Sequence, residues 1–137
     1  MANFGKASLE KLATCDLRLQ VLFKEVVAHF DCVVLCGHRS KEEQDWAVRS
    51  GNSKTPWPKS KHNPEVSLAV DCAPFDRPNF PIDWEDRERM ILFAGFVLGV
   101  AMIRGIPIRW GGDWDSDTQV KDNTFDDLVH FEIVTKD

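Results

Sequence analysis

Two histidines, each near an aspartate, are the residues of this sequence best suited to chemistry. His62 precedes Asp71 by nine positions within SKHNPEVSLAVDCAP, and His130 follows Asp127 by three positions within DDLVHFE. Imidazole and carboxylate are the side chains that catalytic zinc usually takes, three of them with a water molecule in the fourth position. A further carboxylate beside the metal can take a proton from the attacking water. The spacing therefore permits metal-dependent hydrolysis.

Each histidine, taken alone, also has an ordinary structural interpretation. His62 lies in a loop before an expected strand, and His130 lies on the polar face of another. His29 stands at an expected helix end, where a capping or surface histidine is typical. His38 lies in a turn, where either interpretation is open. Two histidine–carboxylate pairs in one chain are what favour a metal site.

A calcium site is a weaker metal hypothesis. Asp113, Asp115 and Asp117 have the alternating spacing that opens an EF-hand loop. That loop needs glycine at its sixth position and glutamate at its twelfth. Thr118 and Thr124 occupy those positions here, so we do not expect calcium to bind there.

The cysteines are interpreted as thiols of a chain that folds in a reducing compartment. They are Cys15, Cys32, Cys36 and Cys72, with no C-x-x-C pair, and the first residues contain no apolar signal-peptide core. Cys32 and Cys36 lie in the apolar run DCVVLCG and are predicted to be small core residues. Cys72 follows Asp71 but points to the opposite strand face, so we count it as core rather than as a ligand.

Two helical regions are predicted in the first half of the chain. Residues 8–30 have a helical pattern with a break near residues 15–16. Ser40 and Glu43 have the spacing of a capping box, which indicates a second helix that stops at residues 51–52.

A third helix is expected between Asp83, as its N-cap, and residues 105–107. It contains the apolar run 90–103, whose 14 residues are too few to span a bilayer. We predict that this helix is buried and that Gly95 and Gly99 allow close packing.

Short strands are expected over residues 31–36, 68–75, 108–110 and 128–134. Few strands interspersed with helices predict an α+β fold, in which a small, mainly antiparallel sheet packs against helices. Because side chains alternate along a strand, Asp71 lies on the face opposite Val70. By the same rule His130 shares a face with Glu132, opposite Phe131. The candidate ligands are thus expected on the polar face of the sheet.

Size and charge narrow the classes of function. The chain has 137 residues, of which 43% are hydrophobic, enough for one domain with its own core. A formal net charge of −5 argues against nucleic acid as a partner. From residue 46 to residue 64, however, the charged residues are all basic: Arg49, Lys54, Lys59 and Lys61. This loop could face an anionic polymer or could simply be solvated.

Four stretches in this order resemble a known family: GHRSKEEQ, SKH…LAVDCAP with PIDW after it, RWGGDW, and DDLVHFEI. Over about residues 4–134 the chain is similar to the zinc D-Ala-D-Ala carboxypeptidase / L-alanyl-D-glutamate endopeptidase family of peptidoglycan peptidases. It is most similar to the small single-domain phage endolysins. The resemblance implies one catalytic domain over residues 1–137, without a separate wall-binding domain, and one zinc ion per chain.

The resemblance also implies the ligand set. His62, Asp71 and His130 match the zinc ligands of the family. The common family spacing is H-x6-D with an intervening glycine, whereas this chain has H-x8-D without glycine. We interpret the two extra residues as a loop variant. The loop 63–67 must then fold back so that His62 and Asp71 reach one metal ion.

Two further residues match catalytic positions. Asp127 resembles the acid/base, with Asp126 as a neighbouring alternative that breaks the three-residue offset. Arg39 resembles the arginine that holds substrate and stabilises the oxyanion.

Supporting roles are implied less sharply. Glu132 could hold the second nitrogen of a ligand histidine or could be a surface strand residue. Gln44 and Ser60 match motif positions without a defined role. The segment WGGDW could form a groove wall whose glycines let the substrate backbone approach, or a tight turn between aromatic core residues.

The resemblance predicts a zinc metallopeptidase that cuts peptidoglycan stem peptides, as an endolysin-type L-alanyl-D-glutamate endopeptidase. One alternative is a D,D-carboxypeptidase of the same family. Another is a non-catalytic, zinc-stabilised wall-binding module, against which Asp127 argues, because a structural site needs no base. We expect a monomer that is made in the cytoplasm without a signal peptide and does not insert into membranes. It would act on the bacterial cell wall after release through a holin-like pore or lysis.

Overall fold

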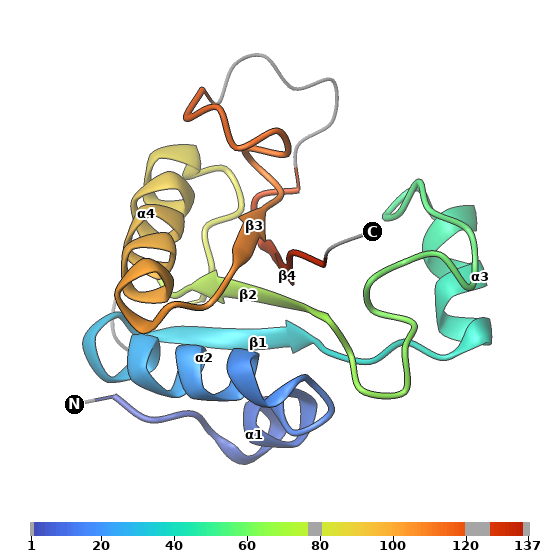
Figure 1. The fold of residues 1–137 in the computed structure, drawn as a ribbon, viewed down its shortest axis with the longest axis horizontal. Coiled ribbons are helices and arrows are strands. Elements are labelled where there is room, and N and C mark those ends of the chain that lie inside the picture. Colours follow the sequence, from blue (N-terminus) through green and yellow to red (C-terminus); the bar gives the residue numbers. More distant parts are fainter. Residues whose placement is uncertain (1, 77–80, 120–126, 136–137) are drawn as a thin grey trace.

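A computed structural model describes residues 2–76, 81–119 and 127–135 of the chain. Within these ranges the elements, in chain order, are α1 (Lys6–Leu12), α2 (Leu17–His29), β1 (Cys32–Cys36), α3 (Lys41–Arg49), β2 (Ala69–Pro74), α4 (Arg87–Arg104), β3 (Ile108–Trp110) and β4 (His130–Ile133) (Figure 1). The predicted α+β fold is confirmed, and each predicted strand agrees with the observed one to within two residues at either end.

The sheet has the strand order β1-β2-β4-β3, and every neighbouring pair is antiparallel. Asp71 of β2 pairs with His130 of β4, and Glu132 of β4 pairs with Arg109 of β3. Directly opposed residues of antiparallel strands project from the same face of the sheet. The register therefore places four polar side chains from three strands together.

The opposite face of the sheet is covered by α2 and α4 (Figure 1). Phe131 of β4 lies between Phe23 of α2 and Phe93 of α4, with ring centroids 5.4 and 6.1 Å away in edge-to-face arrangements. All three rings are fully buried, and each such burial stabilises the fold by roughly 1.5–3 kcal/mol. The helices thus anchor one face of β4, and its other face carries the polar residues.

Local capping explains where α2 and α3 begin. The Asp16 side chain accepts a hydrogen bond from the Arg18 backbone N–H at the start of α2, which confirms the predicted break before it. The capping box of Ser40 and Glu43 is present at the start of α3, with both reciprocal hydrogen bonds. α3 stands apart from the helices that cover the sheet (Figure 1).

The predicted start of α4 is wrong by three residues. Asp86, not Asp83, caps the helix by accepting from the Arg89 backbone N–H, whereas Asp83 accepts from the Glu85 N–H in the turn before it. Both aspartates have the chemistry of an N-cap, so the residue type alone does not separate them. Gly105 ends the helix with φ of 69°, as expected for a left-handed C-cap.

The prediction that α4 is buried holds for one face only. Phe93, Ala94 and Val97 are buried, but Met102 and Ile103 are 79% and 84% exposed. Gly95 and Gly99 do not serve close packing either, because a Cβ at either position would meet nothing within 4 Å. No helix among the described residues is both long enough and apolar enough to cross a membrane.

Candidate metal centre

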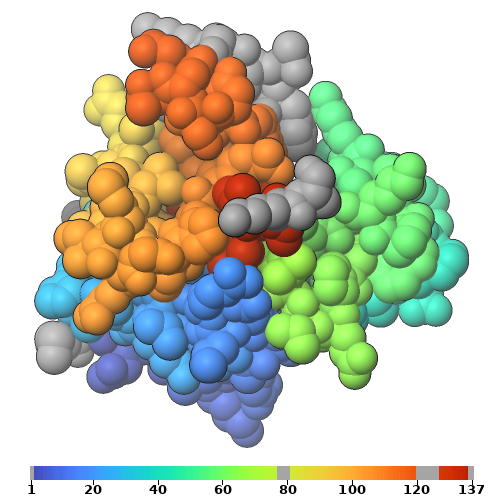
Figure 2. Space-filling model, in the orientation of Figure 1, coloured from blue at the N-terminus to red at the C-terminus, as the bar shows by residue number. Residues whose placement is uncertain are grey.

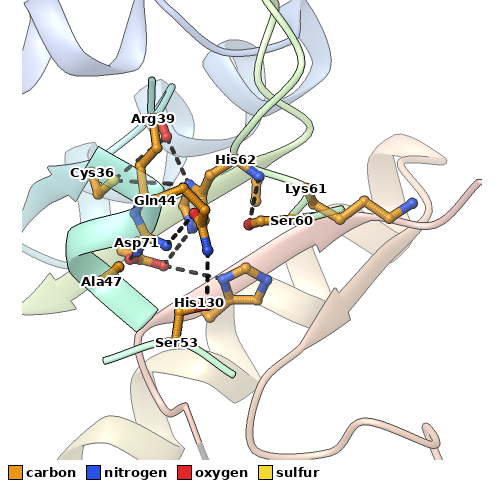
Figure 3. A network of polar contacts seen from close by, with 12 residues as sticks. Cys36, Arg39, Gln44, Ala47, Ser53, Ser60, Lys61, His62, Asp71 and His130 are labelled. Atoms are coloured by element: carbon orange, nitrogen blue, oxygen red, sulfur yellow. Dashed lines mark hydrogen bonds and ion pairs between the residues drawn. The ribbon is translucent and has the colours of Figure 1, made fainter. Parts of the chain in front are cut away.

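The three predicted ligands meet on the polar face of the sheet (Figure 3). Nε2 of His62 and Nδ1 of His130 each lie 3.2 Å from the same carboxylate oxygen, Oδ1 of Asp71. All three side chains are buried. Two imidazole nitrogens directed at one carboxylate oxygen form the kind of donor set that binds a single zinc ion, with a fourth position left open.

The loop before β2 folds back as the nine-residue spacing requires. The Leu68 backbone N–H donates to the Lys61 carbonyl (2.9 Å), and the Arg39 N–H donates to the His62 carbonyl (2.8 Å). Nδ1 of His62 lies 2.7 Å from the Gly37 carbonyl, to which only a protonated Nδ1 can donate. This contact leaves Nε2 unprotonated in the neutral ring and directed toward Asp71.

His130 is held in a corresponding way by Glu132. Nε2 of His130 lies 2.8 Å from Oε1 of Glu132, and Oε2 of Glu132 accepts from Nη2 of Arg109 at 2.7 Å. Glu132 is only 4% exposed, so the interpretation as a surface glutamate is wrong. Burial raises the pKa of Glu132, but His130 and Arg109 outweigh it and the pKa is lowered. A carboxylate behind a ligand histidine fixes its ring and tautomer.

Asp127 lies beside the ligands because of a tight turn and a glycine. Its carbonyl accepts from the His130 N–H (3.1 Å), and its N–H donates to the Gly111 carbonyl (2.8 Å). Potential ligand atoms of Asp127, Asp71 and His130 lie within 4.8 Å of one another. Burial, and then the negative charge of Asp71, raise the pKa of Asp127 above its ordinary value. A carboxyl with a raised pKa is suited to accept a proton.

Of the two interpretations of WGGDW, its glycines fit the tight turn rather than the approach of substrate backbone. A Cβ on Gly111 would lie 2.1 Å from the Asp127 carbonyl oxygen, and one on Gly112 would lie 2.3 Å from the Trp110 ring. Both glycines therefore accommodate the protein's own chain. Trp110 is a core residue, whereas the Trp114 ring packs against His130, with 5.4 Å between centroids. The segment is thus both a turn and a wall of the site.

Arg39 lies on the other side of Asp71. Its Nη2 donates to Oδ2 of Asp71 and its Nη1 donates to Oε1 of Gln44, both at 3.2 Å. Gln44 is fully buried, and its Nε2 donates to the Thr55 carbonyl (2.6 Å) and to Oγ of Ser53 (3.0 Å). Gln44 therefore orients Arg39 and ties α3 to the loop after it (Figure 3).

Asn63 is a supporting residue that the sequence did not reveal. It is 4% exposed; its Nδ2 donates to Oε1 of Gln44 (3.1 Å) and its Oδ1 accepts from the Ser60 N–H (3.0 Å). Ser60 in turn accepts from the His62 N–H through Oγ (3.2 Å). Ser60 and Asn63 thus shape the backbone around His62. An asparagine directly after a predicted ligand histidine was the one available signal.

Charge among the candidate ligands is shared between the imidazoles and Asp71. Burial disfavours the charged form of His62, yet the Asp71 carboxylate raises its pKa to about 10. His130 responds to burial and to Asp71 and Glu132 in the same way, and its pKa rises to about 8. Burial raises the pKa of Asp71, but the two histidines hold it well below the usual range. A site that attracts protons this strongly also suits a divalent cation.

Cys36 departs from its predicted place in the core. It is half-buried, and its Sγ lies 3.9 Å from Nδ1 of His62. Cys36, His62 and Asp71 form a second set of potential ligand atoms within 4.8 Å. Nδ1 of His62 already contacts the Gly37 carbonyl. We therefore favour the set that uses Nε2 of His62 together with Asp71 and His130. Cys72 is fully buried in the core, as predicted.

The carboxylates of the rejected calcium loop do lie together, within 4.8 Å of one another. Asp113 accepts from the backbone N–H groups of Asp117 and Thr118, and Asp117 accepts from that of Gln119. These hydrogen bonds close the loop. Thr124, on which the exclusion of calcium partly depends, and Asp126, the alternative base, lie outside the described residues.

A cavity of about 370 Å³ opens onto the candidate metal centre. One wall comes from residues 52–62 and the other from β3, the WGGDW segment and β4. In Figure 2 the first wall is the green part of the surface on the right, and the second is the orange-to-red part above and in the centre. The lining includes three lysines of the basic loop, Lys54, Lys59 and Lys61. The basic loop therefore borders the site.

Comparisons with known proteins agree with the fold and identify a family. The model of a family described as phage L-alanyl-D-glutamate peptidase matches residues 1–134. This match defines the chain as a peptidase. The chain is 30% identical to the L-alanyl-D-glutamate peptidase of Escherichia phage T5, over 96% of this chain and 98% of that protein.

A solved structure of a similar protein has the same fold. The L-Ala D-Glu endopeptidase ChiX of Serratia marcescens is 26% identical, with a TM-score of 0.73 over 96% of this chain and 90% of that one. The chain belongs to the phage L-alanyl-D-glutamate peptidase family.

Proposed function

We propose that the protein hydrolyses the L-alanyl–D-glutamate bond of peptidoglycan stem peptides with the help of one zinc ion. The observation that carries this proposal is the approach of Nε2 of His62 and Nδ1 of His130 to one oxygen of Asp71, with Asp127 beside them. Family membership supplies the reaction, and this arrangement supplies residues that can perform it.

His62, Asp71 and His130 would hold the zinc ion. Their donor types and number suit a catalytic rather than a structural site, because three protein ligands leave one position for water or substrate. The hydrogen bonds of His62 to Gly37 and of His130 to Glu132 already orient both rings. When bound, the ion would polarise the scissile carbonyl and make a water molecule acidic.

Asp127 would act as general base and then as general acid. Its carboxylate takes a proton from the attacking water and passes it to the leaving amine of the D-glutamate residue. The raised pKa of Asp127 suits both steps. A carboxylate with a higher pKa is a stronger base toward the water, and the carboxylic acid it becomes can then donate the proton to the amine. We expect the loss of this group to lower the rate by about 10²–10⁴.

Arg39 would stabilise the negative charge that develops on the carbonyl oxygen. Its guanidinium lines the cavity while two of its nitrogens are held by Asp71 and Gln44. A cation fixed before the reaction begins needs little reorganisation in the transition state. Gln44 and Ser60 would act through Arg39 and His62 rather than on the substrate.

The alternatives differ in what they release. A D,D-carboxypeptidase would release D-alanine, whereas an endopeptidase of the proposed kind would create new amino-terminal glutamate. A non-catalytic, zinc-stabilised wall-binding module would release neither, and it would have no use for Asp127 beside the ligands.

Mass spectrometry of purified peptidoglycan after incubation with the protein separates these cases. We expect new amino-terminal glutamate from the wild type and about 10²–10⁴ times less from Asp127→Asn. Released D-alanine without new glutamate termini would overturn the proposal in favour of the carboxypeptidase. In the cell we propose that the protein reaches peptidoglycan after its release from the cytoplasm.

A further inference from the structure

We propose that Arg109 recognises a free carboxylate on the residue that follows the scissile bond. The enzyme would then prefer D-glutamate at this position over its α-amide. The inference rests on the proposed function, because it concerns a substrate bound in the cavity beside the candidate metal centre.

The contacts of Arg109 leave much of its guanidinium available. Among the described residues its one hydrogen-bond partner is Glu132, which accepts from Nη2 at 2.7 Å. Nε of Arg109 is buried and has no partner in this part of the chain, so a substrate would meet the Nη groups, at the cavity where the side chain is 38% exposed. Buried polar groups are normally paired, and a guanidinium offers five N–H donors. An arginine that served only to hold Glu132 would not need to face a cavity with most of its donors unused.

The position of Arg109 matches the geometry of the reaction. Glu132 lies between Arg109 and His130, so the guanidinium is one carboxylate away from a predicted zinc ligand. Arg39 occupies the other side of the centre, against Asp71. On the leaving side of the scissile bond, glutamate bears its α-carboxyl on the carbon attached to the scissile nitrogen. That carboxyl must therefore lie close to the metal centre, where a second arginine can reach it.

The surroundings of Arg109 favour an anion. The cavity lining contains more basic than acidic residues: Arg39, Lys54, Lys59, Lys61 and Arg109 are basic, whereas Asp127 and Glu132 are acidic. This excess of positive charge occurs in a chain whose net charge is −5. The guanidinium carbon lies 5.9 Å from the centre of the Trp114 ring. A cation over an aromatic ring is held in orientation, and a planar guanidinium pairs well with carboxylates.

Two synthetic stem peptides test the inference. They are identical except that one carries D-glutamate with a free α-carboxyl after L-alanine and the other carries the α-amide. Because hydrogen bonds to charged groups are the stronger ones, we expect wild-type kcat/KM to favour the free acid by about 10- to 100-fold. In Arg109→Met this preference should fall to near one.

The ratio separates recognition from a merely structural role. If Arg109 only positioned Glu132, both peptides would lose rate equally and the preference would survive, which would overturn the inference. Arg109→Lys keeps the charge but not the planar fork, and should retain an intermediate preference even if the methionine variant folds poorly. Arg104→Met is the matched control. Arg104, the last residue of α4, pairs with Glu25 of α2 and lies outside the cavity lining. Its preference should equal that of the wild type.

The wild type alone gives two more decisive outcomes. Equal cleavage of the two peptides would refute the role of Arg109 and leave the proposed function intact. Cleavage of neither peptide, with the protein loaded with zinc, would overturn the proposed function and this inference with it.

Discussion

Replacement of Gly111 by alanine should remove most activity without removing a catalytic side chain. A Cβ on Gly111 would lie 2.1 Å from the carbonyl oxygen of Asp127 and 3.0 Å from its carbonyl carbon and Cβ, whereas ordinary contact begins at 3.4 Å. These three neighbours are two backbone atoms and a Cβ, so rotation of a flexible side chain cannot relieve the clash. Asp127 must retreat by roughly 1 Å, a misplacement that costs about 10²-fold in rate.

The assay compares kcat, zinc content and thermal unfolding of Gly111→Ala with those of the wild type. We expect kcat to fall by about 10²-fold while zinc remains bound, because none of the three ligands is altered. Gly95→Ala is the control: its Cβ would meet open space on α4, so activity should be unchanged and stability should rise by roughly 0.5–1 kcal/mol. Wild-type kcat in a folded Gly111→Ala variant would refute the reasoning that this glycine places the base.

Further predictions concern the ligands and their support. Glu132→Ala should weaken zinc binding by about 10- to 100-fold, because His130 loses the carboxylate behind its ring; competition with a chromogenic chelator measures this, and unchanged affinity would contradict it. Asp127→Asn should bind zinc as the wild type does, by the same titration, since its proposed role is proton transfer; loss of zinc would instead indicate a ligand. In the metal-free protein, the raised pKa values of His62 and His130, about 10 and 8, stabilise the fold fully below pH 6.5. This contribution is lost as pH rises through both values, so Tm in chelator should fall from pH 6.5 to 9, and apparent zinc affinity should rise as protons cease to compete. A Tm that did not change over this range would show that the imidazoles are not paired with Asp71.

Much of the fold followed from alternation along the strands. The pattern around Asp71 and His130 predicted the polar face correctly, because the hydrophobic core admits only one face of each strand. Proximity of the two residues could not be read from that pattern, since it depends on the register of β2 against β4. Here the motif resemblance supplied what local patterns could not.

The misses have physical reasons as well. Asp83 and Asp86 both suit an N-cap, and the choice depends on the path of the preceding turn. The burial of α4 was overpredicted because a nearly continuous apolar run does not show which face the sheet will cover. Asn63 and Arg109 escaped notice because their importance comes from partners distant in sequence, Gln44 and Glu132.

The sequence left two interpretations of the WGGDW glycines open for a similar reason. Glycine indicates that something approaches closely, but the sequence does not say whether that is a substrate or the protein's own chain. At Gly111 it is the backbone of Asp127.

The central claim is that one zinc ion at His62, Asp71 and His130 is required to cut the L-alanyl–D-glutamate bond. The most direct test follows the release of amino-terminal glutamate from peptidoglycan by protein stripped of metal and then titrated with zinc. We predict no release from the stripped protein and a rise that saturates at one equivalent of zinc per chain. Undiminished release in excess of a strong chelator would contradict the account.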